Sequence, residues 1–373
     1  MTRDQNGLPS KLHMVDLFAG PGGLDVAARW LGVTAEGIEW DDDACETRRT
    51  AGLTTHQGDV RDFKPKRFAD ANILAGGPPC QTYTVAGNGD GRRALEQVVQ
   101  AARNMAAGDD TEEVLTAVED DRTRLVLEPL RWALDAHRAG DPFEAVVLEQ
   151  VPTVLPVWKT IREVLIGIGY SCECKVFRTE QFGVPQTRRR AILIARRSGG
   201  VELPAPTHRA FRQGVGRGEG DPTLEPWRTM AEALGRAEPF TVISNYGTGG
   251  DPKKRGRRRS DQPSATVTGK IMRNRLKMPN GRVERFTSSE AGALQTFPRD
   301  YPWSGNDKAQ QIGNAIPPRL AVHVLAAALG RTVDAASLDA AMTRNWFDTP
   351  AEPPLVSSTL IEVPNRTLLD EMR

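Results

Sequence analysis

The residue with the greatest capacity for chemistry in this sequence is Cys80, near the end of the run Ala75-Gly-Gly-Pro-Pro-Cys-Gln81. A cysteine becomes a strong nucleophile at neutral pH once its pKa is lowered. The apolar run 71–75 predicts a buried strand that ends at two glycines, and Pro78 and Pro79 stiffen the turn that follows. This pattern predicts a thiol that is presented at a fixed angle from the end of a strand. For this stretch alone, an ordinary proline turn with a buried cysteine is the alternative.

A second candidate site is a glycine-rich turn between a strand and a helix. The apolar strand 13–18 is followed by Ala19-Gly-Pro-Gly-Gly23 and then by a helical pattern over 24–31. Glycines let a ligand approach the backbone closely, and the start of the next helix offers free N–H groups. Glu39 lies 19 residues after Gly20, the spacing at which nucleotide-binding folds place an acidic residue on a ribose.

Other polar residues stand at the ends of predicted strands. The indole of Trp40 is suited to lie flat on an adenine ring, and Asp59 can accept a hydrogen bond from an adenine amino group. Glu149 ends the apolar strand 143–148, and open α/β sheets place their sites at the carboxyl ends of strands. A plain turn aspartate and a solvated strand-end glutamate are the alternatives.

Basic residues are concentrated in one part of an otherwise neutral chain. The 373 residues have a net charge of +1, yet 178–285 contain 23 Lys and Arg against 10 Asp and Glu. That region includes Gln186-Thr-Arg-Arg-Arg190, which abuts a predicted strand, and the loop run Lys253-Lys-Arg-Gly-Arg-Arg-Arg259. Such an asymmetry predicts that a polyanion binds on one face. A solvated charge run is the alternative.

The order of strands and helices must position these residues. Short apolar strands alternate with helical patterns as far as residue 197, which predicts an α/β domain with a mostly parallel sheet. After that point Gly, Pro and Arg become frequent and long apolar periodicity is lost. We therefore expect a first domain over 12–197, a small loop-rich domain over 198–284 and a loosely attached tail over 331–373.

Three further segments have weaker patterns. Residues 81–93 are rich in glycine and small polar residues and predict a mobile lid over the thiol. Residues 94–121 have a helical pattern with many acids and predict a solvated surface insertion. Residues 310–318 predict a turn that leads into an apolar helix, and Thr287 or Ser288 is expected to cap an earlier helix.

Composition limits the class of protein. Four cysteines in a chain of this length make no disulfide framework, which favours a reducing cytoplasm. The sequence has no apolar run near the roughly 20 residues that span a bilayer, and its start lacks the apolar core of a secretion signal. Cys172 and Cys174 have no second cysteine pair or nearby histidines, so we predict no metal site.

Taken together, six segments resemble the motifs of the cytosine-C5 DNA methyltransferase family, in the family's order, over residues 12 to about 330. Asp16-Leu-Phe-Ala-Gly-Pro-Gly-Gly23 is similar to its cofactor loop and Gly77-Pro-Pro-Cys-Gln81 to its catalytic loop. Glu149-Gln-Val151 resembles its Glu-Asn-Val motif, and 186–190 resembles its Gln-x-Arg-x-Arg motif. Residues 285–302 are similar to the segment that supports its recognition domain, and Gly313-Asn-Ala-Ile-Pro-Pro318 resembles its closing motif, which folds back beside the first.

The resemblance implies a Rossmann-like S-adenosylmethionine-dependent methyltransferase domain with a target-recognition domain at 198–284 and a return to the methyltransferase domain over 285–330. It implies that Cys80 adds to C6 of a cytosine flipped out of duplex DNA, so that C5 can take a methyl group. Glu149 would stabilise the base at N3, and Arg190 would contact O2. Arg188 would assist and meet a backbone phosphate.

The resemblance and the basic runs also imply binding residues. The cofactor contacts would be Phe18, Gly20, Pro21, Gly22, Gly23, Glu39, Trp40, Asp59, Val60, Pro79 and Asn314. The DNA contacts would be Gln81, Arg92, Lys253, Lys254, Arg257, Arg258, Lys270, Arg273 and Arg275. The simplest such protein is a monomeric, cytoplasmic modification enzyme of a bacterium or a phage-infected cell, with a restriction endonuclease of the same site as a conceivable partner.

Two departures from the family pattern bear on turnover. Gln150 stands where the family usually has an asparagine that braces the thiol turn, and Thr82-Tyr-Thr84 replaces the commoner Gly-Phe-Ser. We expect slower turnover at worst. Two other functions stay open. The first is a tRNA cytosine-C5 methyltransferase, and the long basic region 198–284 argues against it. The second is a non-catalytic DNA-binding relic, and the intact Cys80, Glu149 and Arg190 argue against it.

Overall fold

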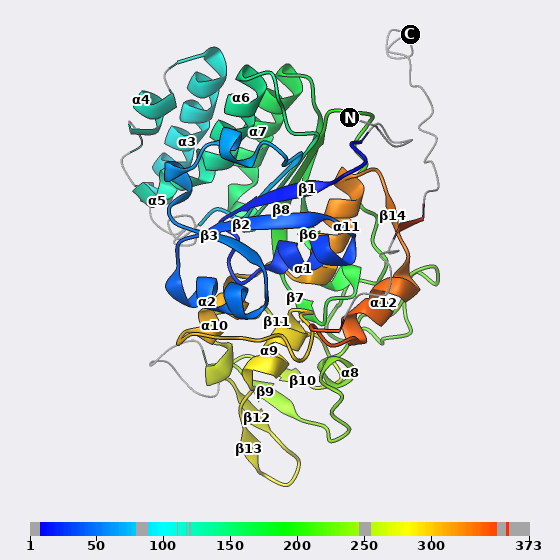
Figure 1. Cartoon of the computed structure of the whole chain (residues 1–373). Coiled ribbons are helices and arrows are strands. Elements are labelled where there is room, and N and C mark those ends of the chain that lie inside the picture. The colour runs from blue at the N-terminus through cyan, green and yellow to red at the C-terminus, as the bar shows by residue number, and fades with distance from the viewer. Residues whose placement is uncertain are drawn as a thin grey trace.

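A seven-stranded sheet forms the centre of the protein, in the order β3-β2-β1-β4-β5-β8-β6 (Figure 1). The neighbouring strands from β3 to β5 are parallel, and β8 is antiparallel to both of its neighbours. The strands are β1 (His13–Leu17), β2 (Thr34–Glu39), β3 (Thr54–Gln57), β4 (Ile73–Gly76), β5 (Ala145–Gln150), β6 (Ser171–Arg178) and β8 (Arg189–Arg196). This architecture confirms the predicted α/β fold with a mostly parallel sheet.

The computed structural model describes residues 8–79, 89–109, 111–116, 118, 121–245, 255–348 and 356–357. For residues 89–92, 111–112, 121–122 and 356–357 it describes the backbone only.

Helices cover both faces of the sheet (Figure 1). On one face lie α1 (Gly23–Trp30) and α11 (Pro318–Ala328), and on the other lie α3 (Gly89–Ala107), α6 (Glu128–Arg138) and α7 (Leu155–Gly167). Shorter helices are α2 (Asp42–Thr50), α4 (Thr111–Thr116) and α5 (Asp121–Arg124). Because both faces are covered, β5 is buried along its whole length, as its continuous apolar run predicts.

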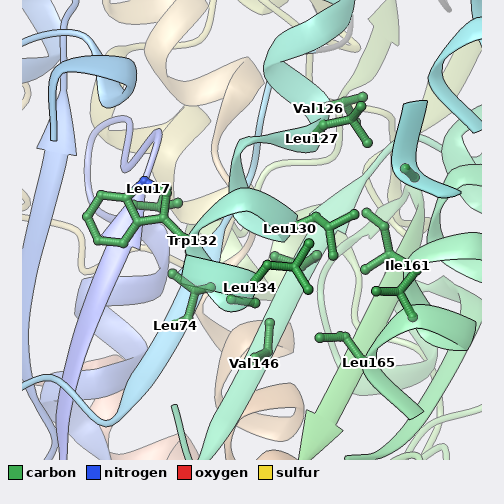
Figure 2. Close-up of a cluster of buried hydrophobic side chains, with 14 of the residues drawn as sticks. Leu17, Leu74, Val126, Leu127, Leu130, Trp132, Leu134, Val146, Ile161 and Leu165 are labelled. Atoms are coloured by element: carbon green, nitrogen blue, oxygen red, sulfur yellow. The ribbon is translucent and has the colours of Figure 1, made fainter. Parts of the chain in front are cut away.

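The larger core lies between the sheet and the helices α3, α6 and α7. Figure 2 shows Leu130 and Leu134 of α6 and Ile161 and Leu165 of α7 gathered over Val146 of β5. The apolar residues spaced three and four apart on α7 therefore belong to the core.

The expectation of a solvated insertion over 94–121 is wrong for α3. This helix begins at Gly89, so residues 89–93 are helical, and Val98, Ala102 and Met105 are fully buried against the core. The many acids near its end dominate the composition. The spacing of the buried positions, four and three residues apart, is the signal of an amphipathic helix.

A second sheet lies beyond the carboxyl edge of the first, at the bottom of Figure 1, in the order β10-β9-β12-β13. Its strands are β9 (Thr241–Ile243), β10 (Arg257–Arg259), β12 (Arg275–Lys277) and β13 (Val283–Glu284), beside the helices α8 (Met230–Leu234), α9 (Ser288–Leu294) and α10 (Lys308–Asn314). A short parallel pair, β7 (Gln186–Thr187) with β11 (Ser264–Ala265), joins the two parts.

The core of this second part draws on residues after 284. Val242 and Leu276 of its sheet pack in one cluster with Phe286, Phe297 and Trp303. The helix α9 begins at the cap Thr287, whose hydroxyl accepts from the Glu290 N–H, which confirms the predicted cap.

Two predictions near the C-terminus are wrong. Residues 308–314 form the helix α10 and not a turn, because Asp307 caps it by accepting from the Gln310 N–H. The described part of the tail is packed: α12 (Ala335–Thr343) buries Leu338, and Trp346 is buried in the core of the second part. The short pair β14 (Thr332–Val333) and β15 (Val356–Ser357) belongs to the same segment. Among the described helices, none combines the length and the apolar character needed to cross a membrane.

Candidate active site

The predicted site residues follow adjacent strands that end at the same edge of the sheet. The register places Leu17 of β1 beside Gly76 of β4, and Gly76 beside Leu148 of β5. The glycine turn after β1, Glu39 at the end of β2, the turn after β4 and Glu149 at the end of β5 therefore lie along one edge. This is the edge where open α/β sheets bind their ligands.

The three glycines of the first turn have different roles. Gly20 and Gly22 have φ angles of +53° and +101°, in the left-handed region that favours glycine. A Cβ on Gly23 would lie 2.4 Å from the carbonyl oxygen of Ile316, so the start of α1 lies directly against the closing motif. A Cβ on Gly20 would meet no described atom within 4 Å. Of the three, Gly20 has room beside it for a ligand, and the other two are needed for conformation and packing.

Glu39 ties this turn to the end of β2. Its carboxylate accepts hydrogen bonds from the backbone N–H groups of Gly20, Trp40 and Asp41, at 2.7, 2.8 and 2.9 Å. Carboxylate oxygens can accept further bonds, so the group can still receive a ribose hydroxyl. The indole of Trp40 is 74% exposed beside it. An exposed aromatic face and a fixed carboxylate fit an adenosine moiety.

The side chains of three other predicted cofactor residues are already bonded to protein groups or buried in the core. Asp59 accepts from the Arg61 guanidinium at 2.6 Å, and this bond holds the pKa of Asp59 below its ordinary value. The side chain of Val60 is buried in the core, so it can offer a ligand only backbone groups. Asn314 is exposed at the end of α10, where its side-chain oxygen accepts from Gln310 at 2.8 Å. The closing motif does fold back beside the glycine turn, as the resemblance implies.

Gln150 holds the turn that leads to the thiol. Its side-chain N–H donates to the carbonyl oxygen of Pro78, and its side-chain oxygen accepts from the Val151 N–H at 2.5 Å. The bracing role that the family gives to asparagine is therefore kept in spite of the extra methylene. Cys80 and Gln81 lie outside the described residues, as does Thr82-Tyr-Thr84.

Glu149 and Arg190 form an ion pair against the same turn. Arg190 Nε lies 2.5 Å from Glu149 Oε1, and the two side chains are only 13% and 8% exposed. A Cβ on Gly77 would lie 3.6 Å from Glu149 Oε2, so the half-buried turn Gly77–Pro79 passes directly beside the carboxylate. The structure thus brings together the acid, the arginine and the turn before Cys80.

The predicted phosphate contact of Arg188 is wrong. Its side chain is fully buried, and one guanidinium nitrogen donates to the carbonyl oxygens of Val267 and Gly313, at 3.0 Å each. Burial and the charge of Arg190 lower the pKa of Arg188, while Glu149 opposes this shift. Arg188 therefore joins three distant segments behind the pair, where a DNA backbone cannot reach it.

A buried amide relay, which the sequence reasoning missed, joins the same segments. Gln186 donates to the side-chain oxygen of Gln295 at 2.5 Å and accepts from the Val267 N–H at 3.0 Å. Gln295 in turn donates to the carbonyl oxygen of Ile312 at 2.6 Å. Gln186 had a signal in its motif. Gln295 had none, because a single glutamine at a helix end is common.

A buried charge cluster under the glycine turn was also missed. Arg48 donates to both carboxylate oxygens of Asp25, at 2.8 Å each, and a Cβ on Gly37 would lie 2.0 Å from the guanidinium. Asp16 is buried beside this pair. Burial raises the pKa of Asp16 well above its ordinary value, and the negative charge of Asp25 adds to the shift.

Three of the predicted DNA residues lie on strands of the second sheet, Arg257 and Arg275 on one face and Arg258 on the other. Arg257 and Arg275 flank Ile243 across neighbouring strands, and Arg259 and Lys277 flank Thr241 in the same way, so four exposed basic residues share one face. Lys270 and Arg273 are exposed nearby in the sequence. Arg258 lies on the opposite face, where its guanidinium is 4.7 Å from the ring centre of Phe211. Lys253, Lys254 and the side chain of Arg92 lie outside the described residues.

Comparisons with known proteins identify the family to which the chain is similar. The profile of the family described as C-5 cytosine-specific DNA methylase matches residues 12–101, 133–215 and 221–329. The chain is 29% identical over 358 residues to the type II methyltransferase M1.HphI of Haemophilus parahaemolyticus, covering 85% of this chain and 87% of that one. It is 26% identical over 362 residues to the type II methyltransferase M.Eco47II of Escherichia coli, covering 86% and 80%.

Solved structures agree at the level of the fold. The Dnmt2 methyltransferase of S. pombe superposes with a TM-score of 0.57 at 18% identity, covering 86% of this chain and 98% of that one. A putative DNA modification methyltransferase encoded within an E. coli prophage gives 0.55 at 17% identity, covering 85% and 98%. With the profile matched across most of its length, the chain belongs to the C-5 cytosine-specific DNA methylase family and is a DNA (cytosine-5-)-methyltransferase.

Proposed function

We propose that the protein transfers the methyl group of S-adenosylmethionine to C5 of a cytosine flipped out of duplex DNA, through a covalent bond between Cys80 and C6. The ion pair of Glu149 and Arg190 beside the Gly77–Pro79 turn carries this proposal. It lies on the same sheet edge as the glycine turn, so a base at the pair and a cofactor at Gly20 would be neighbours.

Membership of the family implies S-adenosylmethionine, and the residues present fit it. Gly20 borders open space, Glu39 presents a fixed carboxylate and Trp40 an exposed indole. When bound, this cofactor supplies an electrophilic methyl group on a sulfonium. Phe18, Pro21, Asp59, Val60, Pro79 and Asn314 are the further contacts that we propose.

The residues of the chain would act in sequence on the base. The Cys80 thiolate forms a bond to C6, and the electron pair of the C5–C6 double bond becomes available at C5 to take the methyl group. Glu149, hydrogen-bonded at N3, and Arg190, at O2, stabilise the charge that develops on the ring. A water molecule takes the C5 proton, the electron pair of the C5–H bond restores the C5–C6 double bond, and the C6–S bond breaks to release the Cys80 thiolate.

DNA is the polyanion that the second sheet suits. Its face holds Arg257, Arg275 and Lys277 together with Arg259, which also pairs with Asp261 at 2.7 Å, and phosphate contacts of such cations supply most of the affinity for a duplex. A cytosine in a stacked duplex is out of reach of a thiol, so flipping at a cost of a few kcal/mol is part of the proposal. The type II relatives suggest a modification enzyme of a bacterium or phage, with a restriction endonuclease of the same site as its partner.

The proposal is tested with purified protein, labelled S-adenosylmethionine, plasmid DNA and tRNA. We expect label in DNA, 5-methylcytosine at one short sequence by bisulfite sequencing, and no label from Cys80→Ala. Duplex DNA with 5-fluorocytosine should trap the wild-type protein covalently, because fluorine cannot leave C5 as the proton does. Label in tRNA alone would show that tRNA, and not DNA, is the substrate. If the folded protein binds DNA but transfers no methyl group, it is a non-catalytic DNA-binding relic.

A further inference from the structure

A polar hollow of about 330 Å³ lies where the hairpin of β6 and β8 meets the strand β10. Its lining includes three arginines, a glutamate and an aromatic ring from separate segments of the chain: Arg178, Glu180, Arg189, Phe211 and Arg258. None of these side chains belongs to the pair at the proposed cytosine site.

Glu180 forms a buried part of the lining. It is only 4% exposed, and its Oε2 has no hydrogen-bond partner in the described part of the protein. Burial raises the pKa of Glu180, and Arg178, Arg189 and Arg258 oppose this shift only in part. The large majority of buried polar atoms in folded proteins have partners, and a donor brought by a ligand would supply one to this oxygen.

The arginines give the hollow a positive charge. Arg178 and Arg189 lie opposite each other in the ladder of β6 and β8, and Arg258 comes from β10. Arg258 also lies 4.7 Å from the ring centre of Phe211, and Trp227 holds that ring from the side with 5.3 Å between ring centres. Three cations against one carboxylate attract an anion, and the stacked guanidinium and ring offer a flat wall to a base.

These features together select the ligand. A bare phosphate would satisfy the arginines but would be repelled by Glu180. A nucleotide whose base has an amino group satisfies both, because carboxylates accept from exocyclic amino groups and arginines bind phosphates. Thymine has no amino group and would leave Glu180 without a donor.

The hollow lies on the other side of the strand β8 from the proposed cytosine site. Arg190 faces Glu149, while the adjacent Arg189 points to the opposite side of the strand β8. We propose that the hollow binds one nucleotide of the DNA substrate other than the target cytosine, with its phosphate on Arg178 and Arg189 and its amino group on Glu180. This inference rests on the proposed action on DNA. Because Glu180 is buried, the base must enter the hollow and leave its stack.

The test uses a duplex library that is randomised around cytosines, methylated by the protein and read by bisulfite sequencing. The wild type should disfavour thymine at one position near the methylated cytosine. Glu180→Gln should accept thymine there about tenfold more often, because its amide can also donate, and the rest of the site should stay unchanged. Glu202→Gln, at an exposed position, should match the wild type.

The arginines should behave differently from the glutamate. Arg178→Gln and Arg189→Gln should weaken binding to all sequences alike and reduce the slope of log affinity against log salt by about one. Arg103→Gln, on an exposed position of α3, should change neither quantity. Phe211→Leu keeps the carboxylate and removes the flat wall, so it should also relax the discrimination against thymine. It serves as the test if Glu180→Gln does not fold.

A thymine preference that is unchanged in folded Glu180→Gln and Phe211→Leu would overturn the site. So would binding of free dCMP to the DNA-free protein that Glu180→Gln abolishes while the methylation profile stays the same, because the occupant would then be a free nucleotide. If the wild type methylates no DNA, the proposed function fails. The same library, selected by binding and sequenced, then decides the site separately.

Discussion

Gln150 donates a side-chain hydrogen bond to the carbonyl oxygen of Pro78, so the strand that carries Glu149 also holds the turn before Cys80. The other end of the same amide accepts from the Val151 N–H at 2.5 Å. Both ends of the amide are thus occupied in fixing the distance between β5 and the turn. The acid of the proposed reaction and the turn that precedes its nucleophile depend on one side chain for their relative position.

Gln150→Ala should therefore slow methyl transfer. Without the amide, the Pro78 carbonyl loses its donor, which costs about 1 kcal/mol and corresponds to a roughly fivefold to tenfold lower kcat. The KM for S-adenosylmethionine should stay the same, because the glycine turn is not touched. Single-turnover rates on a methylatable duplex measure the change. The transfer rate of Gln150→Asn should lie between those of the wild type and Gln150→Ala. If Gln150→Ala transfers at the wild-type rate, Gln150 has no bracing role in the reaction.

Glu149→Gln should abolish most of the activity while the protein still binds DNA. The amide keeps the shape of the side chain but loses the charge that pairs with Arg190 at 2.5 Å and the acidity needed at N3. Loss of one such stabilising group costs about 10² to 10³ in kcat. Transfer rates and gel-shift affinities separate the two effects. Glu163→Gln, at an exposed position of α7, is the matched control, and equal loss in both variants would contradict the role.

Trp40→Ala should weaken the binding of S-adenosylmethionine without slowing methyl transfer at saturation. The indole is 74% exposed beside the fixed Glu39, and stacking of a base on an aromatic ring is worth about 1–3 kcal/mol. We expect the Kd for S-adenosylmethionine, measured by calorimetry, to rise about tenfold or more, and kcat at saturation to be kept. Trp40→Phe should restore part of the affinity. Phe347→Ala, which removes another exposed ring, should leave the Kd unchanged.

Arg188 and Arg275 should differ in the salt dependence of DNA binding. Arg188 is buried on the carbonyl oxygens of Val267 and Gly313, so Arg188→Met should lower the free energy of unfolding by about 2–3 kcal/mol and leave the salt slope unchanged. Arg275 is exposed on the basic face, and Arg275→Gln should reduce that slope by about one with unchanged stability. A lower salt slope for Arg188→Met would show that Arg188 does contact a DNA phosphate, in spite of its burial.

The parts that could be predicted from the sequence depend on local signals. Strands end where apolar runs meet Gly20 or Gly77, and parallel strands bring their ends to one edge, so the neighbourhood of Glu39 and Glu149 followed from topology. A cap at Thr287 or Ser288 followed from the preference of hydroxyl side chains for helix starts, and the structure has Thr287 in that place.

The parts that could not be predicted depend on contacts between distant segments. Arg188 reaches Gly313 across 125 residues and Gln186 reaches Gln295 across 109, and neither residue type indicates burial. Arginine is almost always exposed unless it is paired, which is why a phosphate contact was the natural expectation. The packed α12 was missed for the same reason, since Asp339 pairs with Arg228 of a remote loop at 2.5 Å.

The buried Asp16 should make stability depend on pH in an unusual direction. Burial and the nearby Asp25 raise the pKa of Asp16 in the folded protein, with Glu39 adding to the shift and Arg48 opposing it. The folded state therefore holds a proton that the unfolded chain releases near pH 3.9. The stability that this proton contributes is complete below that pH and is lost as the pH rises toward the folded pKa.

Asp16→Asn should stabilise the protein at neutral pH, because the amide can donate to Asp25 without titrating. The difference in free energy of unfolding between variant and wild type should grow by up to about 1.4 kcal/mol per pH unit from pH 4 until the folded pKa is passed. Urea unfolding of both proteins between pH 5 and 8 measures it, and other titrating groups cancel in the difference. Asp70→Asn, at an exposed position, should give a flat difference. A flat difference for Asp16→Asn as well would mean that Asp16 is ionised in the folded protein.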